Sequence, residues 1–125
     1  MKGILIDSDI LVEVSRGRDR AVLSMWEDLA RRESALLCSP VTVAEIWHGA
    51  RPHEYAAIEA LFGALIPVSI DAEIGRLAGE LLRQFSRSHH VELGDALIAA
   101  TAIARDLSLW TRNRKHYPMK SLAFY

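Results

Sequence analysis

The chain has 125 residues, half of them hydrophobic, and 15 Lys and Arg residues against 16 Asp and Glu residues give it a net charge of −1 at pH 7. This length predicts a single domain, residues 1–125, with enough apolar side chains to bury a core. The nearly neutral charge argues against nucleic-acid binding driven by overall positive charge alone.

Cysteine content and hydrophobic runs bear on the cellular location. The single cysteine, Cys38, excludes an internal disulfide and fits the reducing cytosol. No apolar run approaches the roughly 20 residues that span a membrane, and the apolar run after Lys2 is too short for a signal peptide. We therefore expect a cytoplasmic protein that makes no contact with a membrane.

The apolar residues follow two kinds of spacing along the chain. Short apolar runs without alternation, followed by polar residues, are typical of buried parallel strands. Apolar positions three and four residues apart are typical of helices that bury one face. In chain order, these patterns predict a strand at 3–6, helices at 10–15 and 19–33, a strand at 35–39, a helix beginning near Thr42, a strand at 65–69, helices at 71–86 and 94–105, and strands at 107–111 and 122–124.

Strands that alternate with helices favour βαβ units and a parallel sheet covered on both faces. We therefore predict an α/β fold, namely a three-layer α/β/α sandwich with a mostly parallel sheet of about five strands. Ligands of such open sheets bind beyond the carboxyl ends of the strands. Asp7 stands at this end of the first strand, and Thr111, Arg112 and Asn113 stand at the end of the strand at 107–111.

Four acidic residues stand at strand ends or helix starts, and each has a structural explanation when taken alone. Asp7 and Asp9 can cap the helix that follows the first strand, just as Asp19 can cap the helix predicted at 19–33. Glu45 ends the segment 42–45, Thr-Val-Ala-Glu, which matches a capping box. Asp95 stands at the head of an apolar helix, where a carboxylate complements the helix dipole.

These explanations do not account for the placement of all four acids toward one edge of the predicted sheet. Carboxylates taken out of water need partners, and several that converge are best satisfied by a metal ion. Carboxylate oxygens suit Mg²⁺ and Mn²⁺, whereas the sequence lacks the Cys and His spacing of a zinc site. Because divalent ions among carboxylates commonly serve phosphate-ester chemistry, the acids favour that chemistry.

The remaining charges can complement such a site. Without the four acids, 12 acidic residues stand against 15 Lys and Arg, which leaves a charge of about +3. His116 follows the last predicted site residues and can face the acidic edge, whereas the other histidines are expected on the surface. Two basic clusters can hold phosphates, with a solvated surface of mixed charge as the alternative: Arg16, Arg18 and Arg20, and Arg112, Arg114 and Lys115.

Four motifs occur in a recognisable order: ILIDSDIL at 4–11, SPVTVAE at 39–45, GDALIAA at 94–100 and WTRN at 110–113. Together they resemble the PIN-domain family, specifically its VapC-type toxins, and the match spans the whole chain. The resemblance implies the toxin of a type II toxin-antitoxin system. Such a toxin is an endoribonuclease that depends on Mg²⁺ or Mn²⁺, is usually homodimeric, and is inhibited by a cognate VapB-type antitoxin.

The resemblance also assigns roles to residues. By motif position, Asp7, Glu45 and Asp95 match the catalytic acids and metal ligands. Many relatives carry Asn or Ser at the position of Asp9, and many carry a further acid near the position of His116, so a single metal ion is expected. The residues expected to bind substrate or to support the acids are Asp9, Thr111, Arg112, Asn113 and His116.

Two other functions fit parts of the sequence. A phosphatase of the haloacid-dehalogenase type would use Asp7 as nucleophile and Asp9 as acid and base, but it leaves Glu45 without a role. A non-catalytic RNA- or protein-binding module would keep the fold without turnover. A nuclease assay with Mn²⁺, Mg²⁺ or EDTA distinguishes both alternatives from a metal-dependent ribonuclease.

Overall fold

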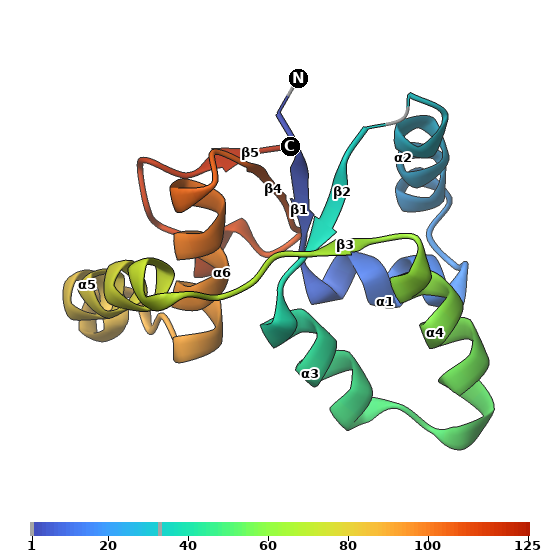
Figure 1. The fold of residues 1–125 in the computed structure, drawn as a ribbon, viewed down its shortest axis with the longest axis horizontal. Coiled ribbons are helices and arrows are strands. Elements are labelled where there is room, and N and C mark those ends of the chain that lie inside the picture. Colours follow the sequence, from blue (N-terminus) through green and yellow to red (C-terminus); the bar gives the residue numbers. More distant parts are fainter. Residues whose placement is uncertain (1, 33) are drawn as a thin grey trace.

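The computed structural model describes residues 2–32 and 34–125. Its centre is a sheet of five strands in the order β3-β2-β1-β4-β5, in which every neighbouring pair is parallel (Figure 1). The predicted parallel sheet is confirmed, although the ladders are shorter than the apolar runs. The strands are β1 (Ile4–Ile6), β2 (Leu36–Cys38), β3 (Ile66–Pro67), β4 (Ser108–Trp110) and β5 (Ala123–Phe124).

Helices cover both faces of the sheet, so the predicted three-layer sandwich is confirmed (Figure 1). Helices α1 to α4 lie on one side, and α5 and α6 lie on the other. Their bounds are α1 (Ser8–Arg16), α2 (Arg20–Arg31), α3 (Pro40–Gly49), α4 (Tyr55–Gly63), α5 (Ala72–His89) and α6 (Leu93–Ala104), with short 3₁₀ helices η1 (Pro52–Glu54) and η2 (Arg114–His116).

The alternation of side chains along β1 divides the core in two. Ile4 and Ile6 point to the core beneath α1 and α2, whereas Leu5 points to the core beneath α5 and α6. All three side chains are at most 3% exposed. Truncating such a side chain to Ala typically costs about 2–5 kcal/mol. The strand that carries Asp7 is therefore held from both faces.

Helix starts follow the local sequence closely. Asp7, Asp19 and Asp71 cap α1, α2 and α5, and each carboxylate accepts a hydrogen bond from a backbone N–H of the first turn. The predicted caps at Asp7 and Asp19 are thus confirmed. Glu33, the predicted end of the second helix, lies outside the described residues.

Two helical details differ from the sequence-based predictions. Helix α3 begins at Pro40 rather than near Thr42, because Ser39 caps it and accepts a hydrogen bond from the N–H of Val41 at 3.1 Å. The predicted capping box at 42–45 is therefore wrong, and Glu45 lies in the second helical turn. Helix α4 was not predicted from the sequence.

The order of the strands creates a crevice at one edge of the sheet. The chain runs outward from β1 to β2 and β3, then returns to place β4 on the other side of β1. In open α/β sheets, such a reversal leaves a crevice beyond the carboxyl ends of the two strands that flank it. Asp7 and Thr111 follow those two strand ends directly. Among the described residues, no helix combines the length and apolar character needed to cross a membrane.

Candidate active site

A pocket of about 580 Å³ lies where the crevice is expected, and acids dominate its lining. Two acids form what we call the floor, Asp7 and Asp9 at the exit of β1. Two more form the wall, Glu45 from α3 and Asp95 from the first turn of α6. The fold thus brings all four singled-out acids to one pocket, together with Ser8, His89, His90, Glu92, Asn113, Lys115 and His116.

Asp7 is the buried acid of the floor, with 7% of its surface exposed. Its Oδ1 accepts a hydrogen bond from the N–H of Ser8 at 2.8 Å, which caps α1. Its Oδ2 accepts hydrogen bonds from the hydroxyls of Thr111 and Tyr117, each at 2.9 Å. Asp7 therefore does more than cap a helix, since it links the start of the chain to the segment after β4.

Tyr117 was missed from the sequence, although Thr111 was singled out. The tyrosine is 3% exposed, and its pKa is raised by burial and then by the negative charge of Asp7, so the phenol keeps its proton. It lies 110 positions away from Asp7 in the chain. No local pattern could link the two residues; its place shortly after the Thr-x-Asn stretch was the only signal.

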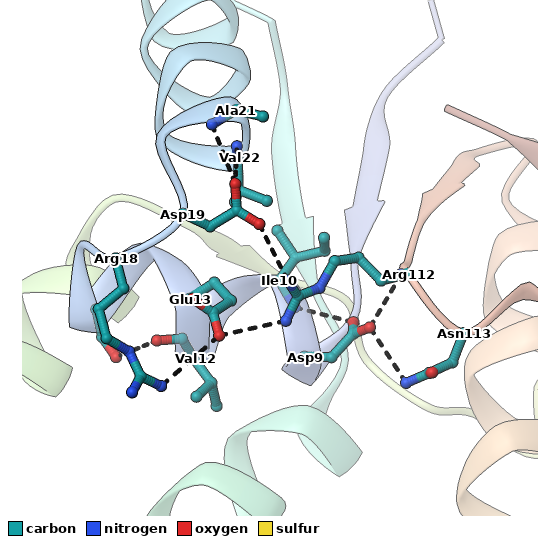
Figure 2. Close-up of polar contacts among 11 residues, drawn as sticks. Asp9, Ile10, Val12, Glu13, Arg18, Asp19, Ala21, Val22, Arg112 and Asn113 are labelled. Atoms are coloured by element: carbon teal, nitrogen blue, oxygen red, sulfur yellow. Dashed lines mark hydrogen bonds and ion pairs between the residues drawn. The ribbon is translucent and has the colours of Figure 1, made fainter.

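Asp9 is half-buried, and both of its oxygens are engaged (Figure 2). Oδ1 accepts a hydrogen bond from the N–H of Ile10 at 2.8 Å. Oδ2 accepts one from the N–H of Arg112 at 2.9 Å and one from the Asn113 side chain at 3.2 Å. Burial raises the pKa of Asp9, and the charge of Asp7 raises it further, while the hydrogen bond from Arg112 opposes the rise. Asp9 fastens the segment after β4 to α1.

The guanidinium of Arg112 completes this fastening. It forms ion pairs with Glu13 of α1 at 3.3 Å and with Asp19, the cap of α2, at 3.1 Å (Figure 2). Arg112 does not line the pocket, so its place is that of a supporting residue. Arg114 lies over the ring of Phe124 at 4.7 Å. Of the basic cluster 112–115, the pocket receives only Lys115.

The wall acids are bound less firmly. Glu45 is exposed, and its pKa is raised first by desolvation and then by the charges of Asp7, Asp95 and Glu92. Asp95 is half-buried and accepts a hydrogen bond from the N–H of Glu92 at 3.4 Å, in keeping with its predicted place at a helix start. Desolvation raises its pKa and Asp7 adds to this, while the Glu92 hydrogen bond and the charge of His116 oppose it. Burial and the neighbouring negative charges therefore both disfavour the ionised forms of these two acids.

The donor set fits a hard divalent cation. Within residues 2–32 and 34–125, no Lys or Arg side chain forms an ion pair with Asp7, Glu45 or Asp95. Carboxylate oxygens are the ligands that Mg²⁺ and Mn²⁺ prefer, and such an ion would neutralise the negative charges that repel one another in the pocket. In the same described part of the chain, however, no three His, Cys, Asp or Glu side chains stand close enough to enclose an ion. The three acids share one pocket without forming a ready-made cage.

The parallel sheet between two layers of helices and the acidic pocket beyond β1 and β4 make this an α/β domain with a carboxylate-lined site. Comparison of sequences identifies the family. The model of the PIN domain matches residues 4–122, and the chain belongs to this family. It is similar to ribonuclease VapC10 of Mycobacterium tuberculosis, with 39% identity over 93% of this chain and 86% of the relative. Ribonuclease VapC19 of the same organism is 37% identical over 92% of both chains.

The fold is also shared with a solved structure. A chain in the crystal structure of VapBC2 from Rickettsia felis, bound to a DNA fragment from their promoter, superposes with a TM-score of 0.82. The superposition covers 98% of this chain and 96% of that chain at 21% sequence identity. The resemblance to the PIN-domain family and its VapC-type members is thus confirmed by sequence and by fold.

Proposed function

We propose that this protein is the toxin of a type II toxin-antitoxin pair and acts as an endoribonuclease that depends on a divalent metal ion. The observation that carries the proposal is the single pocket that gathers Asp7, Glu45 and Asp95 beyond β1 and β4. The names of the VapC10 and VapC19 relatives, both ribonucleases, support the same reaction. We assign these three acids as the catalytic residues and as the ligands of Mg²⁺ or Mn²⁺.

Each part of the pocket has a task in phosphodiester hydrolysis. When bound, the ion supplies an activated water molecule and neutralises charge on the phosphate. Asp7 is held at a fixed place by its hydrogen bonds, whereas Glu45 and Asp95 approach from α3 and α6. Lys115 offers its ammonium group to the RNA backbone at the same pocket. His116 lines the same pocket, where a ring N–H can donate a hydrogen bond to a phosphate oxygen.

We further propose a VapB-type antitoxin as partner, a homodimer as the assembly, and the cytoplasm as the location. The structural neighbour from Rickettsia felis is a VapBC complex, which supports the antitoxin. An acidic pocket also attracts an arginine of a partner, because guanidinium and carboxylate pair through two hydrogen bonds. Co-expression with the neighbouring gene tests this. A neighbour that neither binds the protein nor restores growth would contradict the toxin assignment and leave the nuclease assignment standing.

Cleavage of RNA tests the enzymatic proposal. We expect the purified protein to cut RNA in Mg²⁺ or Mn²⁺ and to stop in EDTA, and Asp7→Asn to be inactive in all three conditions. Cleavage that persists in EDTA, or in Asp7→Asn at the wild-type rate, would contradict it. Mapping the ends of RNA cut in cells after induction then identifies the target.

One observation favours a second candidate, the non-catalytic RNA- or protein-binding module. The acids of the described residues do not stand ready to enclose an ion. RNA binding without cleavage in any metal would select this module. The phosphatase is not favoured, because both oxygens of Asp9 are occupied by hydrogen bonds and are poorly placed to act as acid and base.

A further inference from the structure

Tyr117 is a buried polar residue at the site for which the proposed reaction has no use. Its ring belongs to the core beneath α5 and α6, and only its hydroxyl reaches the floor of the pocket. A buried tyrosine hydroxyl normally finds a partner, but a chain has many backbone carbonyls that would serve. Here the partner is Oδ2 of Asp7, the central acid of the site.

The hydrogen bonds around Asp7 leave few acceptor positions. A carboxylate oxygen has two lone pairs in its plane. Oδ2 accepts from two hydroxyls, those of Thr111 and Tyr117, which uses both of its lone pairs. Among the residues that the structure describes, Oδ1 accepts only from the N–H of Ser8, which leaves one lone pair. The Thr111 oxygen itself accepts from the N–H of Asn113 at 3.0 Å, so its own proton is directed to Asp7.

We infer that Tyr117 is a positioning residue that, together with Thr111, occupies Oδ2 of Asp7 and so commits Asp7 to bind the divalent cation through Oδ1. This inference rests on the proposed metal-dependent function. Outer hydrogen bonds of this kind orient a ligand before the cation arrives, so that less ordering is required on binding. The rigid ring of Tyr117 sets the position of its hydroxyl from the core, independently of the exposed parts of the pocket.

Metal affinity without turnover tests this role. Isothermal titration of Mn²⁺ into wild-type protein and Tyr117→Phe compares two chains that differ by one hydroxyl. We expect about 10–100-fold weaker binding in Tyr117→Phe, the usual cost of losing a partner of a metal ligand. Thr111→Val is expected to weaken binding in the same direction, whereas Thr111→Ser, which keeps the hydroxyl, is expected to restore most of the affinity.

Tyr55→Phe is the matched control, because Tyr55 is 44% exposed on α4 and does not line the pocket. It should bind Mn²⁺ as the wild type does. Titrations are run below the melting temperature of each variant, so a purely structural role would lower the melting temperature and leave affinity unchanged. Wild-type affinity in Tyr117→Phe would overturn the inference and leave the proposed function intact. Absence of Mn²⁺ binding to the wild type would overturn the metal-dependent function and this inference with it.

Discussion

The floor and the wall of the pocket hold their acids in different ways. Within the described residues, the carboxylates of the floor acids, Asp7 and Asp9, together accept six hydrogen bonds, four of them from residues 111–117 at the far end of the sequence. Of the wall acids, Asp95 accepts a hydrogen bond from Glu92 at the start of its own helix. The pKa values of Glu45 and Asp95 are both raised, first by desolvation and then by neighbouring negative charges. The fold therefore holds the floor acids in place, whereas the proposed function assigns to a bound cation the task of bringing the wall acids together.

The largest expected effect is the loss of catalysis when a wall acid is substituted. Asp95→Asn is nearly isosteric and retains an oxygen for the backbone N–H of Glu92. Because it removes a proposed metal ligand, we expect cleavage to be abolished. Because it also removes one repelling charge, we expect the free energy of unfolding in EDTA to stay the same or rise. RNA cleavage and urea denaturation check the two halves. An active Asp95→Asn, or one that unfolds several kcal/mol more easily, would contradict the division between wall and floor.

Removing an acid of the floor should instead lower the stability of the fold. In Asp7→Ala, the hydroxyls of Thr111 and Tyr117 lose their acceptor in a buried place and α1 loses its cap. Each unpaired buried group costs about 1–3 kcal/mol, so we expect a loss of about 2–5 kcal/mol of unfolding free energy. Glu45→Ala is the control and should change stability by no more than about 0.5 kcal/mol. Equal losses in both variants would show that floor and wall do not differ.

Substitutions of two basic residues after β4 should have different effects on RNA binding. Lys115→Ala should flatten the slope of log affinity against log salt by roughly one unit, as expected for one lost phosphate contact. Arg112→Ala should leave that slope unchanged, because its guanidinium is paired with Glu13 and Asp19. It should instead cost up to about 1 kcal/mol of stability, typical of partly exposed ion pairs. Fluorescence anisotropy over a salt series, with catalytically inactive protein, measures the slopes.

The smallest expected effect is on the pH dependence of stability in EDTA. The pKa values of Glu45 and Asp95 are raised in the folded protein, so folding favours their protonated forms. Their stabilising contribution is present below the ordinary carboxylate pKa of about 4 and is lost as pH rises through the raised values. The wild-type melting temperature should therefore fall with rising pH relative to the Glu45→Gln, Asp95→Asn double variant. If the melting temperatures of the two proteins changed with pH in parallel, this would contradict the raised pKa values that desolvation and the neighbouring charges give Glu45 and Asp95.

What could be predicted from the sequence is what depends on near neighbours. The caps at Asp7 and Asp19 follow from the residues beside them, and the parallel sheet follows from short apolar runs between helices. The helix start before Glu45 was placed wrongly because two cap patterns overlap there. Ser39-Pro40 combines a cap with the proline that suits a first helical turn, and this pair begins the helix.

What could not be predicted depends on contacts between distant segments. The gathering of the four acids in one pocket is an exception, because the ends of parallel strands meet at one edge of a sheet whatever their distance in the sequence. The hydroxyl of Tyr117 and the ion pairs of Arg112 depend on where residues 111–117 settle against α1 and α2. No spacing in the sequence encodes that docking, so Arg112 was grouped with residues that meet RNA.

The stoichiometry of Mn²⁺ binding tests the central claim most directly, because it asks whether floor and wall share one ion. Electron paramagnetic resonance can count free and bound Mn²⁺ in wild-type protein and in Asp7→Asn, Glu45→Gln and Asp95→Asn. The account predicts one tightly bound ion per chain in the wild type and a severe loss of affinity in all three variants. Wild-type affinity in either wall variant would contradict it, because the ion would then be held by the floor alone.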